Sequence, residues 1–425
     1  MGFQNSVCKI TLNQITDIPF ECYEGFFYHN SIEEGLPWGY VNINDTSGAI
    51  LAKFENLQIG AEIQVVLIDI KDELEFPFGD QLVVLNVETD FNKKPDSFVG
   101  QIRVWFGHAW FIYKDIKNHA YQPMNSTKLI KKILESKDRG MKFLTADEYL
   151  SETDDEGTIS RYKVAETDWD FIQNKILPYC AINQLPAHFF SNGYGFLLKS
   201  FQELYTQNPV AIYIPQEGNL TNQEQIEKIK KYLESNNIKV SYPISEAYLQ
   251  IGELDSLKDL YPIFYFEHLD DGTVLTGQKR LGNKVSQRSG ANFGNLIPLD
   301  QKFMLNSTGS GVKIIRNRQA VDSFSLLFET AKHLDFFFSL IIVSSFTGLL
   351  VGQTVSIFVN FVAGDDGKDK EHWISGKWMV SSIEHYSNPE NPKQVFSKTH
   401  LVRPNFIGNN NKTSLRLSAM MYEAI

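Results

Sequence analysis

The side chains of this chain that could do chemistry are scattered along the sequence and form no recognisable catalytic pattern. The sequence contains no GxSxG nucleophile elbow, no HExxH zinc motif, no phosphate-binding P-loop and no GxGxxG fingerprint. Its nine histidines include no HxH or HxxxH pair. The sequence therefore predicts no catalytic residue, no cofactor-binding residue, no cofactor and no metal ligand, and it favours a protein that is not an enzyme.

Three acidic or basic features could in principle contribute to a catalytic or metal-binding site. Asp154, Asp155 and Glu156 are consecutive in a polar loop, so their side chains diverge, whereas a pair of hydrolytic carboxylates must face each other across a cleft. The segment Asp365–Asp369 resembles a calcium loop but lacks the alternating ligands and the closing glutamate. His385 falls on a predicted strand, where we expect an ordinary residue of a β-barrel.

Two other groups could bind a partner. The aromatic residues of the hairpin Phe189–Phe196 could stack on bases or sugars, although packing in a core is the favoured interpretation. Lys128, Lys131 and Lys132 lie off the apolar stripe of a predicted helix, which indicates a solvated helix face.

Composition describes a globular chain with a sizeable core. The 425 residues are 43% hydrophobic, 21% charged and 13% aromatic, which predicts two to four domains rich in β-structure. The formal net charge of −11 disfavours specific binding to nucleic acid. Cys8, Cys22 and Cys180 follow no paired spacing, so we expect a reducing compartment and neither disulfides nor structural zinc.

Hydrophobic alternation predicts a β-rich first segment and a mixed middle. Residues 1–121 contain the expected strands Cys8–Leu12, Glu21–Phe27, Gly39–Ile43, Ala61–Ile70, Gln81–Val87, Gly100–Trp105 and Trp110–Ile116. Cap and turn signals then predict helices near 125–134 and 166–177, a hairpin turning at Asn192-Gly193, a β-α-β segment over 210–242 and a hairpin turning at Asp271-Gly272. Residues 282–313 are expected to form a long loop.

The last β-segment contains a run without formal charge from Phe336 to Gly364, long enough to cross a membrane. Polar residues interrupt the run and its second half alternates, so the sequence predicts two buried strands and no stable membrane insertion.

This segment also repeats an earlier one. The Leu-x-x-Gly-x-x-aliphatic spacing of Leu57–Leu67 recurs in Leu349–Val359, and Gly107–Ile112 echoes Gly376–Val380 with one residue inserted. We therefore predict a duplication in which Gly60 corresponds to Gly352.

Three sets of residues resemble the central hub proteins of phage baseplates, a family that includes tail protein D-type hubs and the hub half of type VI secretion spike proteins. The first is a helix start and the second a strand-turn-strand with Phe and Gly. The third is a Gly-x-Trp-x-Val strand followed by a strand that ends in Leu-x-Arg. These residues are Asp168, Trp169, Phe171 and Ile172; Phe189, Phe190, Gly193, Gly195 and Phe196; and Gly376, Trp378, Val380, Ile383, His385, Leu401 and Arg403.

The resemblance implies an α+β, β-rich fold in which two similar antiparallel β-barrel modules of the tube type flank α/β insert domains. The expected division is a first module over 1–121, a middle α+β domain over 122–209, a peripheral domain over 210–330, a second module over 331–404 and a tail over 405–425. Spike domains known from fused relatives do not follow residue 425, so the spike is expected to be a separate protein.

The resemblance also implies a role. The chain would form a homotrimer whose six modules make a pseudo-hexameric ring in the baseplate of the virion, assembled in the bacterial cytoplasm. The ring would join a tail tube or tube-initiator protein to a trimeric spike, contact other baseplate proteins and let DNA pass. Two alternatives stay open at this point: a carbohydrate-binding tail adhesin with a groove of exposed aromatics, and a cell-wall hydrolase with a carboxylate pair.

Overall fold

A computed structural model describes residues 6–12, 16–17, 22–45, 58–69, 74–91, 100–112, 116, 118–136, 141–145, 161–177, 181–182, 185–215, 227, 231, 234, 238, 240–251, 263–268, 274–279, 338–358, 362–363, 369–370 and 375–403. The chain is β-rich with few helices, and its main element is an 11-stranded sheet. No helix in these ranges is long and apolar enough to span a membrane.

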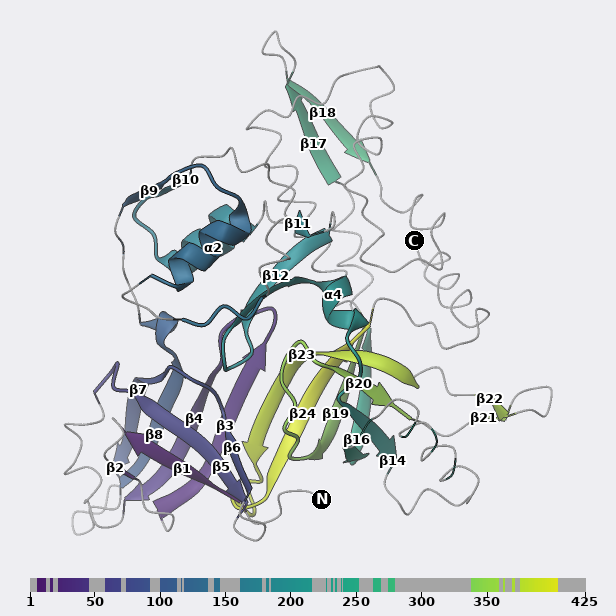
Figure 1. Cartoon of the computed structure of the whole chain (residues 1–425). Helices are drawn as coiled ribbons and strands as arrows, with labels where there is room; N and C mark the ends of the chain where they lie inside the picture. Colours follow the sequence, from purple (N-terminus) through teal and green to yellow (C-terminus); the bar gives the residue numbers. More distant parts are fainter. Residues whose placement is uncertain are drawn as a thin grey trace.

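Strands from both ends of the chain form the main sheet (Figure 1). One path through the sheet runs in the order β15-β14-β20-β23-β3-β4-β8-β7, and β24, β19 and β16 branch from β23. The first part of the chain supplies β3 (Tyr23–Ser31), β4 (Trp38–Asp45), β7 (Leu82–Phe91) and β8 (Gly100–His108). The later part supplies β14 (Ala211–Pro215), β15 (Ser241–Ile244), β16 (Glu246–Ile251), β19 (Phe338–Ser345), β20 (Thr354–Ile357), β23 (Gly376–Ser387) and β24 (Val395–Val402).

A second, four-stranded sheet packs on the first part of the main sheet. It has the order β2-β1-β5-β6. Alternation explains the packing, because Val41 and Ile43 of β4 are buried while Tyr40 and Asn42, which alternate with them, are half-buried on the opposite face. Val41 and Ile43 share a core with Ile10 of β1. The strands of this sheet are β1 (Ser6–Leu12), β2 (Thr16–Asp17), β5 (Ile63–Asp69) and β6 (Leu74–Pro77).

The middle of the chain packs its helices and a hairpin around another core, which we call the middle core: Leu36, Trp110, Leu129, Ile130, Ile133, Leu134, Met141, Phe171, Ile172, Ile176, Leu177, Ala187, Phe189, Phe196 and Leu198. The elements of the middle region are β9 (His119–Tyr121), α2 (Ser126–Leu134), β10 (Arg161–Lys163), α3 (Asp168–Phe171), a π-helical turn (Ile172–Ile176), β11 (Ala181–Ile182), β12 (Leu185–Ser191) and β13 (Phe196–Ser200). Helix α4 (Phe201–Thr206) follows β13 and buries Phe201 and Leu204 in a different core, together with Trp378 of β23.

Local signals placed these middle elements well. The Asn125 side chain caps α2 by accepting from the Lys128 N–H at 2.8 Å, and Thr167 caps α3. The hairpin β12–β13 turns at Gly193, whose φ of 97° suits glycine. Another hairpin pairs β17 (Ile263–His268) with β18 (Val274–Lys279) as predicted. Short strands β21 (Val362–Ala363) and β22 (Asp369–Lys370) also pair.

Three expectations differ from the structure. The predicted strand Trp110–Ile116 instead begins with a 3-10 helix, Ala109–Phe111, because the His108 side chain accepts from the Trp110 N–H and turns the indole into the middle core. The second strand of the β-α-β segment is Ser241–Ile244, so the segment extends beyond the predicted end at residue 242. Two separate closed barrels are not confirmed, because strands of both predicted modules belong to one sheet. Residues 282–313 lie outside the described ranges.

The first part of the chain and the middle hairpin touch backbone to backbone. The Asp80 N–H donates to the Gly193 carbonyl oxygen at 2.7 Å, and the Tyr194 hydroxyl donates to the Pro77 carbonyl oxygen at 2.7 Å. A Cβ at Gly79 would lie 2.3 Å from the Gly193 oxygen. Only a glycine at position 79 lets the two segments approach so closely.

This contact predicts unequal costs for two glycine substitutions. Gly79→Ala and Gly60→Ala both place alanine at a positive φ, of 136° and 90°. Only the Gly79 variant also collides with backbone, because a Cβ at Gly60 first meets the flexible end of Ile112 at 3.2 Å. We expect Gly79→Ala to lower the free energy of unfolding by about 1–3 kcal/mol more than Gly60→Ala in chemical denaturation. Equal losses would show that the close approach is not needed.

Candidate assembly site: a duplicated sheet unit and its junction

The main sheet and β5 contain the same five-strand arrangement twice. The first unit is β3, β4, β5, β7 and β8, and the second unit is β16, β19, β20, β23 and β24. In both units the first two strands pair antiparallel, the second strand pairs with the fifth, and the fifth pairs with the fourth. The third strand meets the fourth in each unit, through one bridge of Glu62 with Val83 just before β5 in the first unit and through a four-residue ladder of β20 with β23 in the second. Chain order and spatial order therefore coincide in the two units.

The turn before the third strand is the same in atomic detail. Gly60 and Gly352 have φ of 90° and 83°. The Gly60 N–H donates to the Val84 carbonyl oxygen at 2.8 Å, and the Gly352 N–H donates to the Val380 carbonyl oxygen at 2.8 Å. The predicted correspondence of Gly60 with Gly352 is thus confirmed, and it makes Val84 the counterpart of Val380.

The other half of the predicted repeat is wrong. The counterpart of Gly376–Val380 is Asp80–Val84, whereas Gly107–Ile112 ends β8 and turns into a 3-10 helix. The sequence did contain the correct signal. Val84-x-Asn-Val-Glu88 and Val380-x-Ser-Ile-Glu384 share a pattern of valine, small polar residue, aliphatic residue and glutamate.

A β-bulge interrupts the fourth strand of each unit at the same point. The register of β7 shifts between Val84 and Asn86, and that of β23 shifts between Val380 and Ser382. An extra residue bends a strand and increases its twist. In β23 the bulge separates two partners on one edge: residues 376–379 pair with β20, and residues 382–386 pair with β3 of the first unit. This β23–β3 pairing, which we call the junction, joins the two units inside the chain.

The residues after each bulge repeat an ion pair. Glu88 Oε2 lies 4.0 Å from Arg103 Nη1, and Glu384 Oε2 lies 3.1 Å from Lys398 Nζ. Both pairs join the fourth strand to the fifth on the half-exposed face. Because solvent screens such pairs, they contribute more to register than to stability.

Titratable groups gather at the junction. His29 of β3 lies between two carboxylates, with Nε2 3.3 Å from Glu34 and Nδ1 3.9 Å from Glu384. His400 Nε2 also approaches Glu384, at 3.8 Å. Burial lowers the pKa of His400, and the Glu384 carboxylate opposes that shift. Glu384 therefore ties β23 to both of its neighbouring strands at this point.

His385 is a core residue, as the sequence indicated. Its ring is buried, shares a hydrogen bond of 2.8 Å with Ser397 Oγ through Nδ1, and lies 4.7 Å from the Phe346 ring. Burial lowers the pKa of His385 to about 3. A ring that stays neutral in a closed core contacts no substrate.

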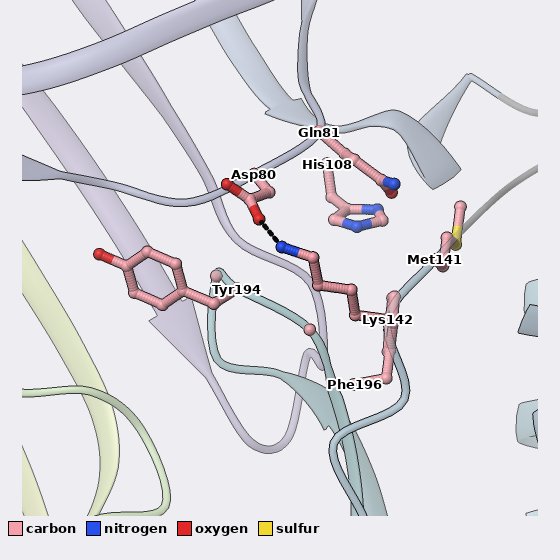
Figure 2. A pocket seen from close by; sticks show the side chains of 9 residues that line it. Asp80, Gln81, His108, Met141, Lys142, Tyr194 and Phe196 are labelled. Atoms are coloured by element: carbon pink, nitrogen blue, oxygen red, sulfur yellow. Dashed lines mark hydrogen bonds and ion pairs between the residues drawn. The ribbon is translucent and has the colours of Figure 1, made fainter.

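A small hollow of about 240 Å³, open to solvent, lies between the first unit and the middle hairpin (Figure 2). At its mouth Lys142 Nζ and Asp80 Oδ2 form an exposed ion pair of 2.7 Å. Burial lowers the pKa of the His108 ring beside it to about 4. The charged groups satisfy one another and the histidine is neutral, so this hollow offers no acid–base pair.

The remaining candidate residues do not come together. Asp154, Asp155 and Glu156, and most of Asp365–Asp369, lie outside the described ranges. Lys128 and Lys132 are exposed, and Lys131 lies 4.0 Å from Glu135. Within the described ranges no group of three or more His, Cys, Asp or Glu residues could hold a metal ion.

The motif residues Trp169, Phe189 and Phe196 pack against other aromatic rings in the middle region. Trp169 lies edge-on to Trp110 at 5.2 Å, and Phe189 stacks on Phe196 at 5.1 Å. Asp168 accepts from Lys163 Nζ at 2.5 Å, in a buried ion pair. The aromatic hairpin is therefore core, as the sequence favoured.

The terminal motif is also structural. The guanidinium of Arg403 lies 4.4 Å above the ring of Trp378 and donates from Nη1 to the Ser375 carbonyl oxygen at 3.3 Å. Burial lowers the pKa of Arg403 to about 10. Cation–π contact and the carbonyl hold this buried arginine against β23.

Comparisons with known proteins place the fold. Neither a family nor a curated protein sequence matches the chain. A tail protein of Neisseria meningitidis has a TM-score of 0.50 at 10% identity, over 94% of this chain and 96% of that one. The 43 kDa tail protein of prophage MuSo2 from Shewanella oneidensis follows at 0.49 and 9%, over 94% and 98%. A type VI secretion component of E. coli scores 0.47 at 9%, over 93% and 76%.

At these identities the first of these likenesses shows a shared fold. The chain has the fold of a tail protein, and the resemblance indicated by its motifs is confirmed at that level.

The buried state of His385 predicts a pH dependence of stability. The pKa of His385 in the folded protein, about 3, lies below the usual 6.5, so between these values the unfolded chain binds a proton that the folded chain does not. The free energy of unfolding should be highest above pH 6.5 and fall as pH decreases towards 3, by up to about 1.4 kcal/mol per pH unit from this group.

Denaturation between pH 7 and pH 4 measures this slope. The His385→Gln variant should have a shallower slope than the unsubstituted protein, because it lacks the buried ring that takes up a proton on unfolding. An unaltered slope in His385→Gln would mean that the buried ring is protonated without unfolding.

Proposed function

We propose that the chain is a structural hub protein of a bacteriophage tail baseplate, with no enzymatic role. Three copies would form a ring of six sheet units, which is pseudo-hexameric because each chain contributes two units. Its location would be the virion tail, after assembly in the cytoplasm of the bacterial host.

The observation that supports this proposal is the duplication. Two units with the same strand order, the same glycine turn and the same bulge lie in one chain, and the junction joins the second unit to the first. A repeated unit that already makes one head-to-tail contact can make the same contact between copies. The tail-protein fold agrees with such a role.

A ring of this symmetry would fit two different neighbours. Six similar units would match a sixfold tail tube or a tube-initiator protein on one side. The threefold repeat of whole chains would match a trimeric spike, expected to be a separate protein, on the other. Other baseplate proteins would contact the outer segments, and the domain division 1–121, 122–209, 210–330, 331–404 and 405–425 stays part of this proposal.

The genome would pass through the centre of the ring. The formal net charge of −11 supports this, because an acidic surface does not hold DNA phosphates. In an electrophoretic mobility assay at low salt, double-stranded DNA should keep its free mobility in the presence of the protein. Tight, salt-dependent retardation would contradict a passive channel.

The trimer is tested by its mass and shape in solution. Size-exclusion chromatography coupled to light scattering should give a mass three times the chain mass of 48.6 kDa. Negative-stain images should show rings with threefold symmetry and a central hole. A monomer at all concentrations, with no ring in the presence of candidate tube and spike proteins, would overturn the hub. Glycan binding would then favour an adhesin, and loss of turbidity of bacterial cell walls would favour a hydrolase.

A further inference from the structure

The junction within the chain uses one edge from each unit and leaves the equivalent edges open. We propose that residues 87–90 of β7 in one copy pair antiparallel with residues 248–251 of β16 in the next copy, in the register of the junction. This inference rests on the proposed hub and specifies the contact that would close its ring.

The two open edges are identified by what their counterparts do. In the second unit, β23 passes from β20 to β3 at its bulge. In the first unit, β7 has the same bulge, but within the described ranges no strand pairs with the edge that corresponds to the junction. Likewise β3 pairs on both edges, whereas its counterpart β16 pairs with β19 alone among the described strands.

Residues of β7 and β23 are matched through their common partner strand. Glu88 lies opposite Arg103 in the first unit, and Glu384 lies opposite Lys398 in the second. Each of these glutamates forms an ion pair with the residue opposite it and follows the bulge of its strand by the same number of residues. Glu88 therefore corresponds to Glu384, and Val87 corresponds to Ile383.

Residues of β3 and β16 are matched through the second strand. Val41 lies opposite Val104, and Ile342 lies opposite Thr399, which occupy equivalent positions on the fifth strands. Phe26 pairs with Val41, and Ala247 pairs with Ile342. Phe26 therefore corresponds to Ala247. Counting along the strands, His29 corresponds to Gln250.

The register between copies follows from these matches. In the junction Ile383 pairs with Asn30, Glu384 with His29, His385 with Tyr28 and Tyr386 with Phe27. The equivalent pairs between copies are Val87 with Ile251, Glu88 with Gln250, Thr89 with Leu249 and Asp90 with Tyr248.

Exposure agrees with an unfilled edge on β16. Tyr248 is 54% exposed, a high value for a large aromatic residue in a sheet. Its counterpart Phe27 is half-buried, stacked on Tyr40 at 5.5 Å. Figure 1 shows β7 and β16 on opposite sides of β3 and β23, so one chain cannot join its own two edges. A second copy of the chain is the partner that presents the complementary strand.

Cysteine cross-linking tests the register. Glu88→Cys and Gln250→Cys are combined in a chain whose Cys8, Cys22 and Cys180 are replaced by Ser. Directly opposite residues of antiparallel strands place their Cα atoms about 4.5–5.5 Å apart, within the range of a disulfide. Mild oxidation should convert most of the protein into covalent oligomers that end at three chains on a non-reducing gel.

The matched control is the same position inside the chain. His29→Cys with Glu384→Cys should form a disulfide within one chain and leave the oligomer size unchanged. A displaced pair, Glu88→Cys with Glu246→Cys, is four residues out of register, about 13 Å along the strand, and should not cross-link. If the control pair oxidises poorly, Val87→Cys with Ile251→Cys and its control Asn30→Cys with Ile383→Cys use the neighbouring positions, where the hydrogen-bonding alternates.

The outcomes distinguish failure of the proposed β7–β16 contact between copies from failure of the proposed hub. A trimer by mass whose matched pairs give no inter-chain disulfide, while the intra-chain control does, would overturn this register and leave the hub standing. Cross-linking of the displaced pair would also overturn it. A chain that is monomeric by mass and gives no inter-chain product would overturn both proposals.

Discussion

The change of partner of β23 at its bulge is the constraint on which the arrangement of the two units depends. Before the bulge β23 belongs to its own unit through β20, and after it β23 belongs equally to the first unit through β3. The extra residue, in the pairing of β23 with β24, bends the strand and increases its twist at the point where the partner on the other edge changes. Strand β23 also contributes to two cores: Trp378, Val380 and Ile383 lie in the core of the second unit, while His385 contacts Phe78 and Phe346 in that of the first.

Residues of the middle region contact both units at two glycines, which let the segments approach closely. Gly35, just after β3, lies against Trp169, where a Cβ would be 2.7 Å from the indole. Gly352 lies against Phe190 at 2.9 Å by the same measure. Strand β12 also contacts both units, because the Ser191 N–H donates to the Gly35 carbonyl oxygen at 2.7 Å and Phe190 lies against Gly352. Because these contacts flank the junction, they restrict the angle between the two units of the chain.

Sequence reasoning found most elements whose signals are local. Alternation located β3, β4, β5, β7 and β8, and the Asn125 cap and the Asn192-Gly193 turn located α2 and the middle hairpin. It failed where pairing between distant segments decides the structure. The junction joins strands more than 350 residues apart, and no local pattern encodes that contact. The 3-10 turn at Ala109 depends on the space that the middle core offers to Trp110.

The duplication was predicted correctly, but its downstream half was aligned with the wrong segment, Gly107–Ile112. Gly60 and Gly352 share the Leu-x-x-Gly-x-x-aliphatic spacing, and the structure gives both of them a positive φ before the following strand. The downstream match relied on glycine and tryptophan, which serve different purposes in the two places: Trp110 packs in the middle core and Trp378 in the second unit. The pattern around Glu88 and Glu384 was the better guide, since ion pairs across equivalent strands preserve register.

An open sheet edge invites any extended strand, so specificity must come from the edges themselves. Two β7 strands that paired antiparallel about Thr89 would set Glu88 against Asp90, and like charges directly opposite are destabilising. Pairing of β7 with β16 sets those acids against Gln250 and Tyr248 instead. The favoured contact is therefore heterologous, with different surfaces on the two partners, and such a contact either closes into a ring or grows into a filament. In a closed ring every β7 edge and every β16 edge would be paired, and neither edge would remain to recruit a further chain.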